Sequence, residues 1–185
     1  MKHSNFKTNV HNLVLAAMFL ALALVLPFLT GQIPQIGGML LPMHLPTLLC
    51  GFLCGGPWGA VVGFLAPLMR SAILGMPPPF PTAAAMAVEM AVYGLVSGLL
   101  YHRLPKSLGG IYTALISAMV AGRLVWGATM FLLTMGSRSA FTLAAFWAGA
   151  VANAIPGIIL QLAAVPALVL SLIHISEPTR RVVIS

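Results

Sequence analysis

The sequence has 185 residues, of which 60% are hydrophobic and only 6% are charged, and its formal net charge is +7. Soluble domains carry about 25% charged residues, and a soluble core of this length could not bury so much apolar surface. With a mean hydropathy of +1.04, the chain is predicted to be all-α, a polytopic integral membrane protein with one membrane domain.

Two other classes are excluded by the pattern of apolar and charged residues. The apolar runs are continuous and longer than the ~10-residue alternating segments of membrane β-barrels. Most of the positive charges lie at chain ends and in loops, which is typical of membrane topology and argues against nucleic-acid binding.

Six membrane spans are predicted. The first is expected to be retained and not cleaved as a secretory signal, and it contains the small-residue pair Ala17 and Ala21. The second contains Pro42 and Pro46, and both it and the third are short for a span, which needs ~20 residues. In chain order the predicted spans are residues 10–29, 39–54, 58–74, 82–101, 111–135 and a sixth within 141–169 that starts near Asn153.

Positive charges predict the orientation of these spans. Lys2 and Lys7 place the N-terminus inside, and the basic loop 102–106 then also falls inside, so six crossings give an N-in/C-in topology. Arg138 is an exception, because it falls in an outer loop. The outer loops 30–38 and 75–81 hold no charge and are rich in glycine and proline, so we expect them to act as lids.

The last sixteen residues are expected to be foreign. The stretch LSLIHISEPTR at 170–180 resembles the translation of a transposon-end adapter used in sequencing libraries. We therefore take residues 1–169 as the membrane domain and residues 170–185 as an artefactual tail, which carries no functional argument.

The cysteines do not predict a metal site. Cys50 and Cys54 lie one helical turn apart, but a tetrahedral zinc site needs four ligands and no partner cluster of Cys or His residues accompanies them. We expect them to be small packing residues, with neither a disulfide nor a bound metal, and we predict no cofactor.

The polar residues of the fourth and fifth spans form two stripes. Before the tail, Glu89 is the only acidic residue. Spacings of three and four place residues on one helix face. The stripes comprise Thr82, Met86, Glu89, Tyr93 and Ser97 in the fourth span, and Tyr112, Ile116, Met119, Arg123, Trp126, Met130 and Thr134 in the fifth.

Two arginines bracket Glu89 in depth. With a rise of ~1.5 Å per residue, Arg70, Glu89 and Arg123 lie roughly 6 Å, roughly 10 Å and roughly 18 Å below the outer ends of their helices. A lone charge in hydrocarbon costs at least ~2.5–3.5 kcal/mol and is usually paired or functional. We therefore hypothesise that Glu89 neutralises one arginine and that the other leaves a positive charge for the carboxylate of a bound ligand.

Each of these residues also has a structural interpretation. Glu89 and one arginine can form an ion pair between helices, and Arg70 can snorkel to the outer interface. His44, in the broken second span, can be hydrogen-bonded structure or a pocket residue, and Trp126 can pack in the core or stack on a ligand ring. Asn153 and Gln161 are interpreted as hydrogen-bonding residues between helices.

Several stretches resemble the substrate-binding S component of energy-coupling factor (ECF) vitamin transporters. The resemblance covers roughly residues 10–169 and rests on the Ala17/Ala21 pair, on the stretch from LPMHLPTLLCGFLCGG to VEMAVYGLVSGLLY, and on AGRLVWG and NAIPGIILQ. It implies six helices, with a vitamin bound near the outer face under the first and third outer loops, here 31–40 and 75–81.

The resemblance also implies partners and a location. Ala17 and Ala21 would face a transmembrane T component, and two cytoplasmic ATPases would supply the energy for uptake across a prokaryotic plasma membrane. The expected substrate-binding residues are His44, Arg70, Glu89, Tyr93, Arg123 and Trp126. The surplus cation favours a carboxylate-bearing vitamin or precursor, such as pantothenate, folate, niacin or biotin.

Rival functions fit the sequence less well. The chain lacks the GxxxxGK[ST] pattern of a P-loop. A metalloprotease needs more metal ligands than His44 and Glu89. A serine protease needs a Ser–His pair, but Ser97 lies too deep in the membrane to reach His44. A channel pore needs a ring of charged or carbonyl groups, which a chain with one acidic residue supplies poorly. We expect no enzyme activity, and the alternative to an S component is a stand-alone secondary transporter of a small organic anion.

Overall fold

A computed structural model describes residues 2–30, 41–135, 142–150 and 152–182, and side chains within 9–28, 41–135, 142–150 and 152–172. All regular elements in these ranges are helical. In chain order they are α1 (Lys2–Val25), η1 (Leu26–Thr30), α3 (His44–Cys54), α4 (Gly56–Leu74), η2 (Pro79–Ala83), α5 (Ala84–Arg103), α6 (Leu108–Thr134), α7 (Leu143–Ala150), η3 (Ala152–Ala154) and α8 (Ile155–Val182).

Five stretches in the described part of the chain are long and apolar enough to cross a membrane: Asn9–Phe28, Gly56–Leu74, Pro79–Arg103, Leu108–Thr134 and Leu143–Leu172. The predicted second span corresponds to α3, which has only 11 residues. The membrane character is therefore confirmed, whereas the six crossings and the N-in/C-in orientation stay predictions. Arg138 and most of loop 30–38 lie outside the described residues.

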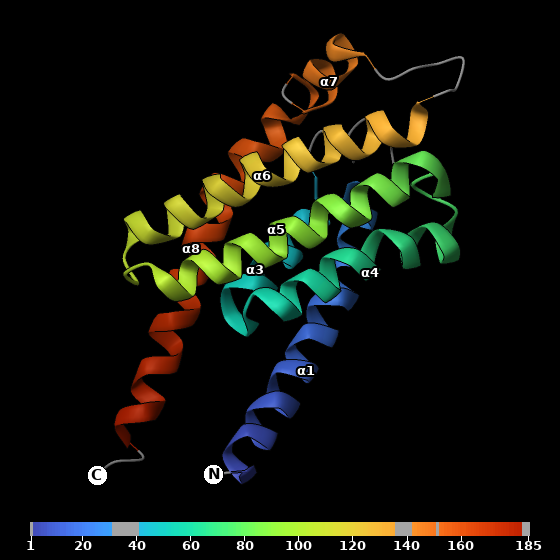
Figure 1. Ribbon diagram of the computed structural model, residues 1–185. Coiled ribbons are helices and arrows are strands. Elements are labelled where there is room, and N and C mark those ends of the chain that lie inside the picture. Colours follow the sequence, from blue (N-terminus) through green and yellow to red (C-terminus); the bar gives the residue numbers. More distant parts are fainter. Residues whose placement is uncertain (1, 31–40, 136–141, 151, 183–185) are drawn as a thin grey trace.

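The short helix α3 lies inside the bundle. It packs against α1, α4, α5 and α8, and Figure 1 shows it behind α5, between α1 and α8. Nine of its eleven residues are buried. A helix too short to span is tolerated at membrane depth where protein covers its ends, and these neighbours surround α3 in that way.

Prolines mark the start of α3 but do not break it. Pro42 precedes the helix, and Pro46 is its third residue. The first four N–H groups of a helix have no partner within the helix, so a proline costs no hydrogen bond at this position. The break predicted at Pro46 is therefore wrong.

Glycines bring α3, α4 and α5 into backbone contact. A Cβ added to Gly94 of α5 would lie 2.2 Å from the backbone of Gly59 in α4, and one added to Gly59 would lie 2.7 Å from Cα of Gly51 in α3. Small residues allow membrane helices to approach this closely. The three helices thus form a tight unit, in which α4 and α5 run side by side and antiparallel (Figure 1).

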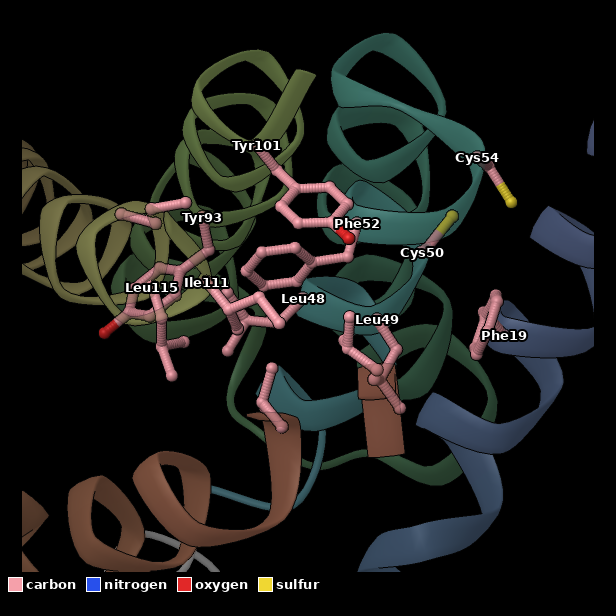
Figure 2. Close-up of a cluster of buried hydrophobic side chains, with 14 of the residues drawn as sticks. Phe19, Leu48, Leu49, Cys50, Phe52, Cys54, Tyr93, Tyr101, Ile111 and Leu115 are labelled. Atoms are coloured by element: carbon pink, nitrogen blue, oxygen red, sulfur yellow. The ribbon is translucent and has the colours of Figure 1, made fainter. Parts of the chain in front are cut away.

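The main apolar core lies between this unit, α6 and α8. Figure 2 shows Phe52 and Tyr101 at its centre, with their rings in an edge contact at a centroid distance of 5.1 Å. Leu48, Leu115 and Val165 are fully buried in the same cluster. Cys50 and Cys54 are buried here as free thiols, and no group of three or more potential metal-ligating side chains occurs in the described residues.

Candidate functional site

Glu89 is buried between three helices and faces two basic side chains. Its exposed fraction is 1%. Oε1 lies 3.0 Å from an Arg123 guanidinium nitrogen on α6 and 3.7 Å from Nε2 of His44 on α3. The predicted pairing of Glu89 with one arginine is present, and that arginine is Arg123.

A glycine on α6 explains how Arg123 reaches Glu89. A Cβ on Gly122 would lie 2.4 Å from the Tyr93 ring and 3.3 Å from the Glu89 backbone oxygen. Because Gly122 lacks this atom, α6 can approach α5 closely at this level. The neighbouring Arg123 is then within reach of the carboxylate.

Tyr93 and His44 complete the cluster. Their rings meet edge to face with centroids 5.1 Å apart, and both side chains are at most 1% exposed. Figure 2 shows the Tyr93 hydroxyl directed away from Phe52 and Tyr101. The hydroxyl lies near the Arg123 guanidinium but makes no hydrogen bond of normal geometry. We refer to His44, Glu89, Tyr93 and Arg123 as the polar cluster.

The polar cluster has unused hydrogen-bonding capacity. Among the described residues no hydrogen-bond partner is present for either His44 ring nitrogen, Glu89 Oε1, the Tyr93 hydroxyl, or Nε and one terminal nitrogen of Arg123. The 3.0 Å contact of Arg123 with Glu89 is thus an ion pair without the alignment of a hydrogen bond. Buried polar groups in proteins normally have partners, so this cluster is open to an additional polar group.

Arg70 does not join Glu89 in an ion pair. Its guanidinium donates a 3.1 Å hydrogen bond to the Leu24 carbonyl near the end of α1 and lies over the Phe28 ring, 5.6 Å from the centroid. The last carbonyl groups of a helix lack partners within the helix and carry partial negative charge. Arg70 therefore stabilises the C-terminal end of α1, and the two arginines do not converge on Glu89.

Trp126 faces α7. Its ring stacks on Phe146 at a centroid distance of 6.4 Å, and Phe146 also fills the space beside Gly127. A hollow of about 310 Å³ opens on the same side, but no residue of the polar cluster lines it. The hollow is lined by Leu124, Gly127, Ala128, Phe131, Thr142, Leu143 and Phe146.

The two predicted stripes differ in burial. Glu89, Tyr93 and Ser97 on α5 are buried. On α6, Tyr112 and Ile116 are 39% and 49% exposed. At the N-terminal end of α6 the stripe thus lies on an exposed face, and alanine, leucine and isoleucine residues are buried there instead.

Gln161 is a polar residue for which the sequence predicts only hydrogen bonds between helices. It is fully buried on α8, and neither its amide oxygen nor its amide nitrogen has a hydrogen-bond partner in the described part of the chain. Its position four residues before the buried Val165 was the signal in the sequence, because this spacing places both on one helix face.

Ala17 and Ala21 are both exposed on α1, whereas the neighbouring Ala16 and Ala23 are buried. The pair therefore does not serve packing within the described bundle. Its predicted contact with a partner stays a prediction.

Comparison with known proteins provides independent evidence of the family. Residues 11–169 match the family model described as the substrate-specific component of ECF transporters. No curated protein and no solved structure matches the chain. The family match confirms the resemblance seen in the sequence. The chain thus belongs to the substrate-specific components of ECF transporters, which are membrane subunits of a transport module with a T component and ATPases, and which are not enzymes.

Proposed function

We propose that this subunit binds a carboxylate-bearing vitamin, or a related small molecule, from the outer side of a prokaryotic plasma membrane. ATP-driven uptake then follows in complex with a T component and two cytoplasmic ATPases. The observation that carries the proposal is the buried polar cluster, in which Arg123 retains unused donors beside an already paired Glu89.

Charge balance supports an anionic ligand. Glu89 offsets the charge of Arg123, and Arg70 interacts with a carbonyl dipole and an aromatic face and with no carboxylate among the described residues. The outer half of the bundle thus keeps a net positive charge. An anion is the ligand that such a site favours, because buried charges in membranes are normally paired.

Arg123 is the proposed contact for the ligand carboxylate. Its Nε and one terminal nitrogen are both unused, and two guanidinium donors can hold a carboxylate in a bidentate pair. Glu89 orients the guanidinium from the opposite side. His44 and Tyr93 supply further polar atoms in the cluster. Trp126, which stacks on Phe146 of α7, is the proposed stacking residue for a ligand ring.

The remaining predicted residues have supporting roles in this proposal. Arg70 holds the C-terminal end of α1 on α4 and acts as a positioning residue. Ala17 and Ala21 form a notch on the exposed face of α1, where a helix of the T component can approach closely.

A binding experiment tests the proposed site. The full chain, purified in detergent, is titrated with nicotinate, pantothenate, biotin and folate by calorimetry, and Arg123→Gln is compared with Arg103→Gln, whose side chain is exposed at the end of α5. We expect at least one carboxylate to bind and Arg123→Gln to weaken it by about 100-fold, since hydrogen bonds to charged groups contribute about 1.5–3 kcal/mol. Equal loss in both variants, or no loss in Arg123→Gln, would contradict the proposal.

Glu89→Gln separates a ligand site from a purely structural ion pair. This change keeps the shape of the side chain and removes its negative charge, so a bound carboxylate experiences less repulsion. We expect carboxylate binding to persist or strengthen. If Arg123 instead serves only to neutralise Glu89, neither the unaltered chain nor this variant will bind a carboxylate detectably.

A further inference from the structure

Among the described residues, Gln161 is a fully buried amide that the polar cluster does not explain. Its exposed fraction is 0%, and both amide atoms lack hydrogen-bond partners among the described residues. Leaving a buried polar group unpaired costs about 1–3 kcal/mol. A leucine or methionine at this position would avoid that cost, so the presence of glutamine indicates a partner outside the described residues.

The topology places Gln161 at the same end of the core as the polar cluster. Leu48, Leu115 and Val165 share one apolar cluster. Gln161 precedes Val165 by four residues on α8, as His44 precedes Leu48 on α3. In Figure 1 α6 runs in the direction opposite to α8, so Arg123, which follows Leu115 on α6, is displaced towards the same end.

The helical rise gives the distance of each group from the apolar cluster along its own helix. Arg123 lies eight residues beyond Leu115 and Gln161 four residues before Val165, which correspond to roughly 12 Å and roughly 6 Å of rise. A small molecule with polar groups at both ends can contact both side chains.

The chemistry of the amide defines the group that it can recognise. A glutamine side chain offers one acceptor and two donor hydrogens, so its best complement is a neutral group that also donates and accepts. We infer that Gln161 is a specificity-determining residue, which pairs with an amide or ureido group on the same ligand whose carboxylate contacts Arg123. This inference rests on the proposed function and narrows its substrate class to carboxylates that also carry such a group.

The test compares probes that differ in the neutral group. Pantothenate carries a carboxylate and an amide, biotin a carboxylate and a ureido group, and nicotinate a carboxylate alone. Their affinities are measured by calorimetry for the full chain, for Gln161→Met, which keeps the length of the side chain, and for Asn153→Leu, which removes an exposed amide on η3.

We expect pantothenate or biotin to bind the unaltered chain at least tenfold more tightly than nicotinate. Sites built to hydrogen-bond a substrate strongly reject analogues that lack the matching group. In Gln161→Met this preference should disappear while nicotinate affinity stays the same. Asn153→Leu should behave like the unaltered chain.

The melting temperature without ligand separates recognition from a structural role. If Gln161 serves to bind a ligand, Gln161→Met will leave the melting temperature unchanged or raise it, because the substitution removes an unpaired buried amide and its desolvation cost. A lower melting temperature, or failure to fold, would assign the amide to helix contacts and overturn the inference. Gln161→Glu is the second variant, since it stays polar but loses both donors, and it should also lose the preference.

Failure of this inference can be distinguished from failure of the proposed function. If nicotinate, pantothenate or biotin binds and Gln161→Met binds it equally well, only the role of Gln161 is wrong, and buried water is then the partner of the amide. If none of the carboxylates binds the unaltered chain, both the inference and the carboxylate ligand are wrong.

Discussion

The pairing of Glu89 illustrates what sequence can predict at the scale of a residue. A single carboxylate in an apolar helix must be paired, and only Arg70 and Arg123 were available at the right depth. Depth along a helix follows from the constant rise per residue, so both candidates could be named. Which of the two pairs with Glu89 depends on helix rotation and on the space that Gly122 provides, and neither can be read from spacing alone.

Arg70 is expected to affect stability more than binding. Arg70→Gln removes the charge that interacts with the Leu24 carbonyl and the Phe28 ring. Charges at helix ends typically contribute 0.3–1 kcal/mol, or about 2 kcal/mol in partly buried geometries. We expect a lower melting temperature in detergent, with carboxylate affinity reduced much less than by Arg123→Gln.

The melting temperature and the carboxylate affinity of Arg70→Gln are measured together, so that an effect on stability can be separated from an effect on binding. Thermal unfolding and calorimetric titration with pantothenate are carried out on one preparation. A loss of affinity equal to that of Arg123→Gln, with unchanged melting temperature, would show that Arg70 contacts the ligand directly.

At the scale of helices and loops, the sequence predicted which helices form better than it predicted where they begin and end. The long apolar runs became α1, α4, α5, α6 and α8. The second span was predicted to be broken at Pro46, yet α3 begins at His44 and accommodates this proline in its first turn. The exposure of the N-terminal end of the α6 stripe could not be predicted, because alternative faces of an apolar helix differ little in composition and packing against neighbours decides between them.

The glycine contacts between α3, α4 and α5 give a sharp stability prediction. Gly94→Ala would place a methyl group 2.2 Å from the Gly59 backbone, which cannot rotate away. Overpacking of this kind costs about 1–3 kcal/mol or more. We expect a marked fall in the melting temperature of the purified protein.

Gly109→Ala is the matched control for this change. Its added Cβ would meet only the Ser107 hydroxyl, at 3.9 Å, and Gly109 is exposed in the first turn of α6. The alanine should be neutral or slightly stabilising, because alanine favours helix over glycine by about 1 kcal/mol. Equal destabilisation by both variants would contradict the close approach of the helices.

For the whole molecule, composition and the length of the apolar runs were sufficient to predict a helical membrane protein. The number of crossings could not be predicted in the same way, because the length of α3 depends on how its neighbours cover it. Surfaces that bind partners are equally difficult to predict, since a pair of small residues has the same sequence pattern whether it packs within the bundle or against another protein. The exposure of Ala17 and Ala21 separates these alternatives for α1.

The exposed alanine pair is expected to bind the T component. The double variant Ala17→Trp with Ala21→Trp fills the notch with large rings, so a neighbouring helix can no longer approach closely. We expect loss of co-purification with a co-expressed T component and ATPases, while carboxylate binding by the isolated subunit is retained. Ala72→Trp, on the exposed face of α4, is the control and should leave assembly intact, whereas equal loss in both variants would argue against a specific role for α1.

The most direct test of the substrate-binding role is native mass spectrometry of the full chain purified from membranes. We expect a retained small molecule whose mass and fragmentation identify a carboxylate, present in the unaltered chain and in Arg103→Gln and absent in Arg123→Gln. A protein that carries no small molecule and does not respond to nicotinate, pantothenate, biotin or folate would contradict the proposed site. Retention of the same molecule by Arg123→Gln would place the binding site elsewhere in the bundle.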